Sequence, residues 1–327
     1  MMAEKTVLIL ATGGTIAGLG DSGKTTGYKS GALTAESLIE TVPQIKDLAY
    51  IKTEQLFNLN SDDMTQSEWL QIANKVNELE NDSSVDGIVI THGTDTMEEL
   101  SYFLNLVCNV TKPVVFTGSM RPATAISADG PLNLYQSVLV ATSDDAKNKP
   151  VMCVMNDTIL DARTFYKTST SSVATMQSAD LGQLGIVRDN YVLFTDDGNK
   201  TKHTFNSEFR IDGVKSLPKV SVVYFHVDAD VANLTFALEN SDGVVIAGAG
   251  AGEFSHIWKE VIDKAKKPVV VSTRTSTGTI AQDALLSKNC IASSYLNPQK
   301  AAVLLRVALM NDLNRSNEDI FRIFIEY

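Results

Sequence analysis

Short runs of apolar residues recur along the first half of the chain, and this recurrence limits most strongly how the chain can fold. The first run begins at Thr6 and reads TVLILAT, and similar runs cover residues 87–91, 113–117 and 150–155. Each run has the length of a strand, and segments with helix-like periodicity separate them. Strands without polar alternation are buried on both faces, which is typical of parallel sheets built from βαβ units. The sequence therefore predicts an α/β protein with a mainly parallel sheet.

The segments between these runs carry helix start signals. Thr65 and Glu68 have the spacing of a capping box, and Thr96 and Glu99 repeat it before a second apolar series. Asp129 precedes a proline, which is favoured in the first turn of a helix. These signals predict that a helix follows each of the three positions.

The chain is expected to divide into two domains. Its 327 residues suit about two domains at roughly 150 residues each. From Asp196 to Pro218 the periodicity fails and the composition becomes polar, which is typical of an interdomain linker. The expected parts are a larger N-terminal α/β domain over residues 1–195, a linker over 196–218 and a smaller C-terminal α/β domain over 219–327.

The strand and helix pattern restarts after this segment. Strands are expected at 220–225, 243–247 and 268–273, and helices at 231–238 and 257–265. Two more helices are expected, one opened by Asn297 and Pro298 and one by Ser316 with Asp319.

Charge excludes several classes of partner. The chain has 28 Lys and Arg against 39 Asp and Glu, which gives a net charge of −11, and no locally basic stripe opposes that field. Nucleic acid and anionic membranes are therefore not expected partners. No apolar run approaches the roughly 18 residues of a membrane span. Because the first residues pass straight into a strand, no signal peptide is expected, and a cytoplasmic location is predicted, or a periplasmic one if a leader has been removed.

Cysteine and histidine usage predicts chemistry without a metal or other cofactor. Cys108, Cys153 and Cys290 are far apart and lie in or beside apolar stretches, as buried free thiols do. The four histidines show no spacing of metal ligands. They are His92, His203, His226 and His256.

Glycine-rich segments need structural context before they indicate a function. Residues 18–25 match both GxxxxGK[ST] and GxGxxG. A phosphate-binding loop leaves a strand directly and leads onto a helix, whereas here the predicted strand ends near Thr12 and residues 26–31 cannot start a helix. A glycine-rich loop is the preferred interpretation, and a nucleotide-binding module is an alternative. A second cluster, residues 248–252, predicts a tight strand exit.

Small and polar residues follow each predicted strand of the first domain. The exits are Thr12-Gly13-Gly14-Thr15, Asn60-Ser61-Asp62, His92-Gly93-Thr94-Asp95 and Gly118-Ser119. Ligands of open α/β sheets bind outside the carboxyl ends of the strands. Hydroxyls and backbone amides suit a carboxylate, and Asp62 or Asp95 suits an ammonium. The four exits therefore predict a site for a small zwitterion.

The same residues indicate a threonine nucleophile. No metal site or catalytic histidine is indicated, and two threonine hydroxyls remain for chemistry. Such a hydroxyl is inert until a base takes its proton. Lys167, within the otherwise neutral stretch 165–170, is the candidate base, provided that burial favours its uncharged form.

These residues lie in segments that are similar to those of a known family. The segments are ATGGTIAG at 11–18, THGTDTMEE at 91–99, GSMRP at 118–122, SADGP at 127–131, MNDT at 155–158 and LNPQK at 296–300. Over nearly its whole length the chain resembles the bacterial-type L-asparaginases, especially the type II and glutaminase-asparaginase branch. The resemblance implies the two-domain asparaginase-like fold and hydrolysis of L-asparagine to L-aspartate and ammonia through an acyl-enzyme, without a cofactor.

The resemblance also implies catalytic roles. Thr15 is the nucleophile, assisted by Tyr28 on the same flexible loop. Thr94 activates the attacking species, and Lys167 is its base. Asp95 orients the lysine and binds the ammonium of the substrate.

Binding roles and assembly follow from the same resemblance. Ser61 holds the α-carboxylate, Asp62 binds the ammonium, and Ser119 faces the leaving amide, with Gly14 and Gly93 beside them. The family assembles as a homotetramer, a dimer of intimate dimers, in which the second domain of one subunit completes its neighbour's site.

The chain departs from the family pattern at three places. Leu285 stands where the partner subunit usually donates a carboxylate, and Ala251 stands where an asparagine is usual. The positions near Asn81 and Val110 that align with the cysteines of a disulfide known in some secreted members are not cysteine, which suits a reducing compartment. The first two departures leave open a glutaminase-asparaginase of broad specificity, and an amino-acid sensor without catalysis is a further alternative.

Overall fold

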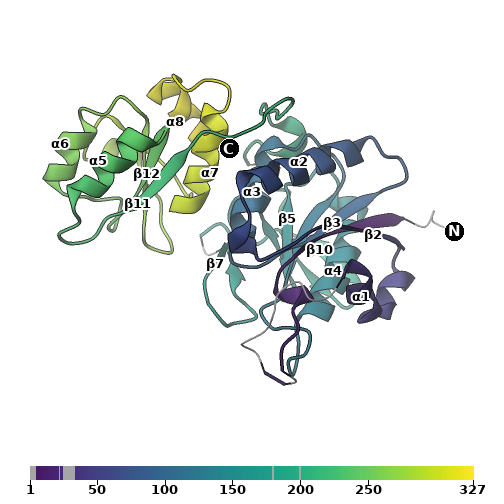
Figure 1. Cartoon of the computed structure of the whole chain (residues 1–327). Helices are drawn as coiled ribbons and strands as arrows, with labels where there is room; N and C mark the ends of the chain where they lie inside the picture. Colours follow the sequence, from purple (N-terminus) through teal and green to yellow (C-terminus); the bar gives the residue numbers. More distant parts are fainter. Residues whose placement is uncertain (1–4, 22, 25–33, 179, 199) are drawn as a thin grey trace. The chain divides into compact units, whose positions relative to one another are not determined.

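The computed structural model describes residues 5–21, 23–24, 34–178, 180–198 and 200–327. The chain divides into two compact units, residues 1–212 and 213–327, which Figure 1 shows in one view. Each unit carries its own sheet. No helix among the described residues is both long and apolar enough to cross a membrane.

The N-terminal unit is built on an eight-stranded mixed sheet. In pairing order its strands are β10 (Tyr191–Phe194), β9 (Gly185–Arg188), β6 (Thr158–Asp161), β5 (Met152–Met155), β4 (Val114–Thr117), β3 (Gly87–Thr91), β1 (Thr6–Gly13) and β2 (Tyr50–Leu59). Strands β5, β4, β3, β1 and β2 run parallel to one another, whereas the pairs β5–β6, β6–β9 and β9–β10 are antiparallel. The four predicted apolar runs are β1, β3, β4 and β5, which confirms the predicted fold class.

Helices cover both faces of this sheet (Figure 1). They are α1 (Ala35–Glu40), α2 (Gln66–Glu80), α3 (Met97–Val107) and α4 (Gly130–Ala141), with short 3-10 turns η2 (Pro43–Asp47), η4 (Asp144–Ala146) and η5 (Thr204–Asn206). Helices α1 and α4 share a buried cluster with Val7 and Ile9 of β1. Helices α2 and α3 lie on the opposite face, where the rings of Trp69 and Phe103 are 5.5 Å apart.

Helix starts agree with the sequence only in part. The capping box at Thr65 is present, since Thr65 Oγ1 accepts from Ser67 N and Glu68 Oε2 accepts from Thr65 N. The second predicted box is wrong, because Thr96 makes no side-chain cap and its hydroxyl donates to the carbonyl of Ser61 at 2.9 Å. Asp129 is the N-cap of α4, but it too makes no side-chain cap bond.

A short ribbon stands apart from the main sheet. It consists of β7 (Tyr166–Lys167) and β8 (Met176–Gln177), which pair antiparallel through two residues each. Neither strand was predicted, because two residues are too few to show alternation. The ribbon carries Lys167.

Part of the polar segment 196–218 packs into the N-terminal unit. His203, Thr204 and Ser207 are buried, and Ser207 Oγ donates to the carbonyl of Leu106 in α3 at 2.5 Å. Burial lowers the pKa of His203 to about 4. The division between the units falls after Asp212, inside this segment.

The C-terminal unit is a four-stranded parallel sheet with helices on both faces. Its elements are β11 (Val220–Tyr224), α5 (Val231–Asn240), β12 (Gly243–Gly248), α6 (His256–Ile262), β13 (Val269–Thr273), the turn η6 (Gln282–Ala284), β14 (Cys290–Ala292), α7 (Pro298–Leu309) and α8 (Asn317–Glu326). Val244 and Ile246 pack with Trp258 in one cluster, whereas Gly243 faces Leu305 of α7. Successive residues of β12 point to opposite faces of the sheet, and a helix covers each face, so β12 is buried on both sides.

The predicted elements of this unit are confirmed, with β14 missed. Asn297 and Ser316 cap α7 and α8 by accepting from the amides of Lys300 and Asp319. Helix α6 is shorter than expected and ends at Ile262. Residues 248–252 form the expected tight exit, because a Cβ on Gly248 would lie 2.4 Å from the backbone of Gly252.

All three cysteines are free and buried, as predicted. Burial raises the pKa of Cys290 to about 12 and raises that of Cys108 further. At neutral pH both thiols are protonated.

Candidate active site

Three strand exits of the N-terminal unit meet in direct contact. Gly14 follows β1 with a φ of 84°, and a Cβ there would lie 2.5 Å from the amide nitrogen of Gly93 after β3. A Cβ on Gly93 would lie 2.7 Å from Ser61 Oγ, after β2. Only glycine permits such approaches. The structure thus brings Gly14, Gly93 and Ser61 together, as the order of strand exits predicts.

Thr15 lies beside this contact in a short 3-10 turn, η1 (Thr15–Ala17). The turn is closed by hydrogen bonds from Ala17 N to the carbonyl of Gly14 and from Gly18 N to that of Thr15. Thr15 is 8% exposed. Tyr28, expected as its helper, lies outside the described residues.

Ser61 and Asp62 begin the turn η3 (Ser61–Asp63), which follows β2. Ser61 is buried, whereas Asp62 is exposed. The carbonyl of Ser61 accepts from Thr96 Oγ1 at 2.9 Å. This hydrogen bond links Ser61 to the start of α3. The hydroxyl of Thr96 therefore stabilises the position of Ser61 and does not cap the helix.

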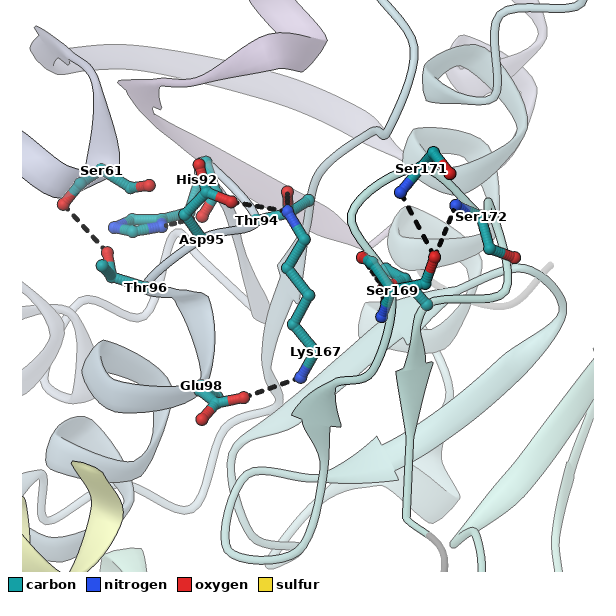
Figure 2. A network of polar contacts seen from close by, with 12 residues as sticks. Ser61, His92, Thr94, Asp95, Thr96, Glu98, Lys167, Ser169, Ser171 and Ser172 are labelled. Atoms are coloured by element: carbon teal, nitrogen blue, oxygen red, sulfur yellow. Dashed lines mark hydrogen bonds and ion pairs between the residues drawn. The ribbon is translucent and has the colours of Figure 1, made fainter. Parts of the chain in front are cut away.

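Lys167 joins Thr94 and Asp95 through its ammonium group (Figure 2). Its Nζ lies 2.8 Å from Thr94 Oγ1 and 2.6 Å from Asp95 Oδ1. The side chain of Lys167 is 17% exposed, and that of Asp95 is 69% exposed. The lysine is therefore largely shielded from water, while the carboxylate keeps a face open to a ligand.

The main chain of Lys167 is held as well. Its amide donates to Glu98 Oε2 at 2.7 Å, and Glu98 lies in the first turn of α3 with 3% exposure. The sequence shows Glu98 only as one letter of a longer motif. Nothing in its spacing points to a contact with a residue 69 positions later.

His92 lies beneath the site as a neutral side chain. It is completely buried, and burial lowers its pKa to about 4. Its Nδ1 is 2.7 Å from the carbonyl of Gly93, and its Nε2 is 3.3 Å from Met64 Sδ. Its position supports the backbone of Gly93.

The exit of β4 lies against Thr94. A Cβ on Gly118 would lie 3.3 Å from Thr94 Cγ2, so the two exits are in van der Waals contact. Ser119 is buried, and its hydroxyl donates to the carbonyl of Arg121 at 2.7 Å. This serine directly follows the glycine that approaches Thr94, and its hydroxyl is oriented by its own loop.

Two residues brace that loop and were missed as parts of the site. The carboxylate of Asp129 accepts from the amides of Met120 and Arg121, each at 2.9 Å. Asn133, one turn later, donates to the carbonyl of Gly118 at 3.0 Å. Asp129 and Asn133 are four residues apart at the start of a helix. This spacing is the sequence signal that could have indicated them.

The glycine-rich residues 18–24 make contacts that differ from those of a phosphate loop. The amides of Gly20 and Gly23 donate to the hydroxyl and the carbonyl of Thr124. Lys24 pairs with Asp21 at 2.7 Å. Strand β1 is followed by the turn η1, and no helix begins at the residues described between Gly18 and Lys24.

Ala251 and Leu285 belong to the C-terminal unit. Ala251 is exposed in the turn after β12, and Leu285 is partly buried against the core of that unit. Among the residues that the structure describes, no three His, Cys, Asp or Glu side chains are grouped so that they could hold a metal ion.

Known proteins match the chain over both units. The model of the asparaginase N-terminal domain matches residues 6–199, and that of the glutaminase/asparaginase C-terminal domain matches residues 219–324. The chain is 42% identical to L-asparaginase 2 of Escherichia coli strain K12, with 100% of this chain and 94% of that protein covered. It is 40% identical to the glutaminase-asparaginase of Acinetobacter glutaminasificans, with 94% and 95% covered.

A solved structure agrees with these matches. It is the crystal structure described as a "Probable Cytoplasmic L-asparaginase" from Campylobacter jejuni. The TM-score is 0.92 at 43% identity, and 99% of this chain and 100% of that chain are covered. The chain belongs to the asparaginase family.

Proposed function

We propose that the chain is an L-asparaginase that hydrolyses L-asparagine to L-aspartate and ammonia. The observation that carries the proposal is the group formed by Lys167, Thr94 and Asp95, with Nζ at 2.8 Å and 2.6 Å from its two partners. This group lies at the strand exits of a chain with L-asparaginases among its relatives.

In the proposed reaction Thr15 is the nucleophile. Its oxygen forms a bond to the side-chain amide carbon of asparagine, the C–N bond breaks, and ammonia leaves with the proton that Thr15 gives up. Tyr28 assists this proton transfer. The product of this half-reaction is an ester between Thr15 and the β-carboxyl of aspartate.

The second half-reaction uses Thr94, Lys167 and one water. Thr94 activates the attacking water, and Lys167 is the base that accepts the proton through Thr94. The water oxygen bonds to the ester carbon, the bond to Thr15 breaks, and the returning proton restores the threonine hydroxyl. Asp95 orients the lysine throughout.

Substrate binding follows from the zwitterionic end of asparagine. Ser61 holds the α-carboxylate beside the backbone of Gly14 and Gly93. Asp62 and Asp95 hold the ammonium, and both are exposed enough to reach it. Ser119 faces the leaving amide. No step uses a metal ion.

The assembly belongs to the same proposal. The active form is a homotetramer, a dimer of intimate dimers, in which the C-terminal unit of one subunit completes its neighbour's site. A cytoplasmic location is proposed, with a periplasmic one as the alternative, and the absence of cysteine near Asn81 and Val110 supports the first.

The deciding experiment is ammonia release from L-asparagine and L-glutamine side by side, with and without a chelator. We expect turnover of asparagine that the chelator leaves unchanged. No release from either amide would contradict the proposed function, and loss of activity with the chelator would contradict the metal-free mechanism.

A glutaminase-asparaginase of broad specificity is the second candidate, supported by the relative of that name at 40% identity. Glutamine is longer by one methylene, which a pocket usually distinguishes by about 10- to 200-fold. Leu285 and Ala251 supply no charge or amide, so the longer substrate has fewer restraints on its ammonium end. We expect kcat/KM to favour asparagine at least about tenfold, and equal values would favour the second candidate.

A further inference from the structure

Glu98 and its neighbours hold both ends of Lys167 (Figure 2). The ammonium contacts Thr94 and Asp95, while the amide of the same lysine donates to Glu98 Oε2 at 2.7 Å. Residues 94–98 form one continuous stretch that leads from the exit of β3 into α3. The same short segment, residues 94–98, therefore contacts both the main-chain amide and the Nζ atom of Lys167.

The main-chain contact matters because the ribbon that carries Lys167 is small. Strand β7 has two residues, and among the described residues it pairs with β8 alone. An isolated two-stranded ribbon is marginally stable. The bond to Glu98 ties this ribbon directly to the helix that follows Thr94 and Asp95.

The carboxylate of Glu98 suits this task. It is 3% exposed, and a buried carboxylate is costly unless it is hydrogen-bonded. It lies in the first turn of α3. The pKa of Tyr166, next to Lys167, is raised by burial first and then by Asp180 and Glu98.

We propose that Glu98 is a positioning residue for catalysis: its side chain sets the distance from Lys167 to Thr94 by holding the main chain of the lysine. The inference rests on the proposed function. Glu98 acts through the length of its side chain, which brings Oε2 to the amide, and its charge is secondary.

The comparison of Glu98→Asp with Glu98→Gln tests this directly. Aspartate keeps the charge but is shorter by one C–C bond of about 1.5 Å, so its oxygen falls outside hydrogen-bond range of the amide. Glutamine keeps the length and an acceptor oxygen. We expect kcat of Glu98→Asp to fall about 100-fold, since a 1 Å misplacement costs about that much, with KM little changed. We expect Glu98→Gln to keep kcat near the wild-type value.

The reverse order, or no change of kcat in either variant, would overturn the inference. Should Glu98→Asp fail to fold, Glu98→Gln decides alone, because loss of its activity with an intact fold contradicts a role through length. Glu80 offers a matched control, since its Oε2 accepts from the amides of Thr111 and Lys112 on another loop. Glu80→Asp should lower the melting temperature and leave kcat unchanged.

Crystal structures of both variants separate this inference from the proposed function. In Glu98→Asp the Nζ of Lys167 should move out of hydrogen-bond range of Thr94 Oγ1, and in Glu98→Gln the 2.8 Å contact should remain. An unmoved lysine in Glu98→Asp refutes the inference even if the wild type is inactive on asparagine. Lack of ammonia release by the wild type refutes the proposed function alone.

Discussion

Thr15 is buried but lies in a turn outside the sheet. Its hydroxyl can therefore be removed to test catalysis with little effect on the fold. Thr15→Ala should lower kcat for asparagine by at least about 10³-fold, because removing a nucleophile abolishes its chemical step. The fold should persist, since the turn is closed by backbone bonds. Thr12→Ala is the control, because Thr12 Oγ1 donates to the carbonyl of Thr91 and should affect stability instead. Near wild-type turnover of Thr15→Ala would refute its role.

Lys167 can be tested by removing its amine while keeping most of its volume. Lys167→Met should reduce kcat about 10²- to 10⁴-fold, which is the usual contribution of a general base. Circular dichroism and thermal melting should show little change. Lys149→Met is the matched control, because the side chain of Lys149 is also shielded, at 8% exposure, and lies over the ring of Phe194. A fully active Lys167→Met variant would be incompatible with the proposed base.

The buried histidines make the free energy of unfolding depend on pH. Burial lowers the pKa of His92 and of His203 to about 4 in the folded chain, below the ordinary histidine value of 6.5. Between these values the unfolded chain binds protons that the folded chain does not. The free energy of unfolding should therefore fall from pH 6.5 to pH 4, by up to about 1.4 kcal/mol per pH unit for each histidine.

Urea unfolding followed by tryptophan fluorescence at pH 5 and pH 7 measures this dependence. His92→Gln should reduce the difference between the two pH values. His226→Asn, at an exposed histidine, is the control. An unchanged difference in His92→Gln would contradict the assignment.

At the scale of elements, two threonines at helix starts should respond differently to the same substitution. Thr65→Ala removes a cap of α2 and should lower the free energy of unfolding by about 1 kcal/mol. Thr96→Ala removes the bond to the carbonyl of Ser61, so we expect a raised KM for asparagine and a smaller loss of stability. Urea unfolding and steady-state kinetics on both variants check this. Equal kinetic parameters in Thr96→Ala and the wild type would disprove the link.

Strands buried on both faces could be predicted from the sequence, and edge strands could not. Strands β1 and β3 are continuous apolar runs because helices cover both of their faces. Strand β2 is one edge of the sheet and contains no fully buried residue, so YIKTEQLFNL is not a continuous apolar run, and the sequence indicated only the polar exit that follows it. Strands β6, β9 and β10 have four residues, as β4 and β5 do, but unlike those two they are not buried throughout, so they form no continuous apolar run. The two strands of the ribbon that carries Lys167 have only two residues each.

The site was predictable where sequence motifs carried it and unpredictable where distant segments meet. The contacts among Gly14, Gly93 and Ser61 follow from the order of strand exits. The contacts of Glu98 with Lys167 and of Asp129 with the Ser119 loop join segments through backbone amides. Backbone amides are the same at every residue, so the sequence does not mark which of them will be bound.

At the scale of the whole molecule, every described candidate residue except Ala251 and Leu285 lies in the N-terminal unit. The C-terminal unit would have a role in catalysis if it completed the site of a neighbouring subunit. Multi-angle light scattering should therefore show a tetramer, or at least a dimer, and activity should fall on dilution below its dissociation constant. An active monomer would rule out the shared site.

The buried thiols give each unit its own chemical reporter. Cys108 and Cys153 lie in the N-terminal unit and Cys290 in the C-terminal unit, and all three are inaccessible in the folded chain. A thiol reagent can modify them only when the surrounding structure opens. Pulsed alkylation followed by peptide mass spectrometry would therefore time the opening of each unit separately in the unmodified protein, with no engineered probe.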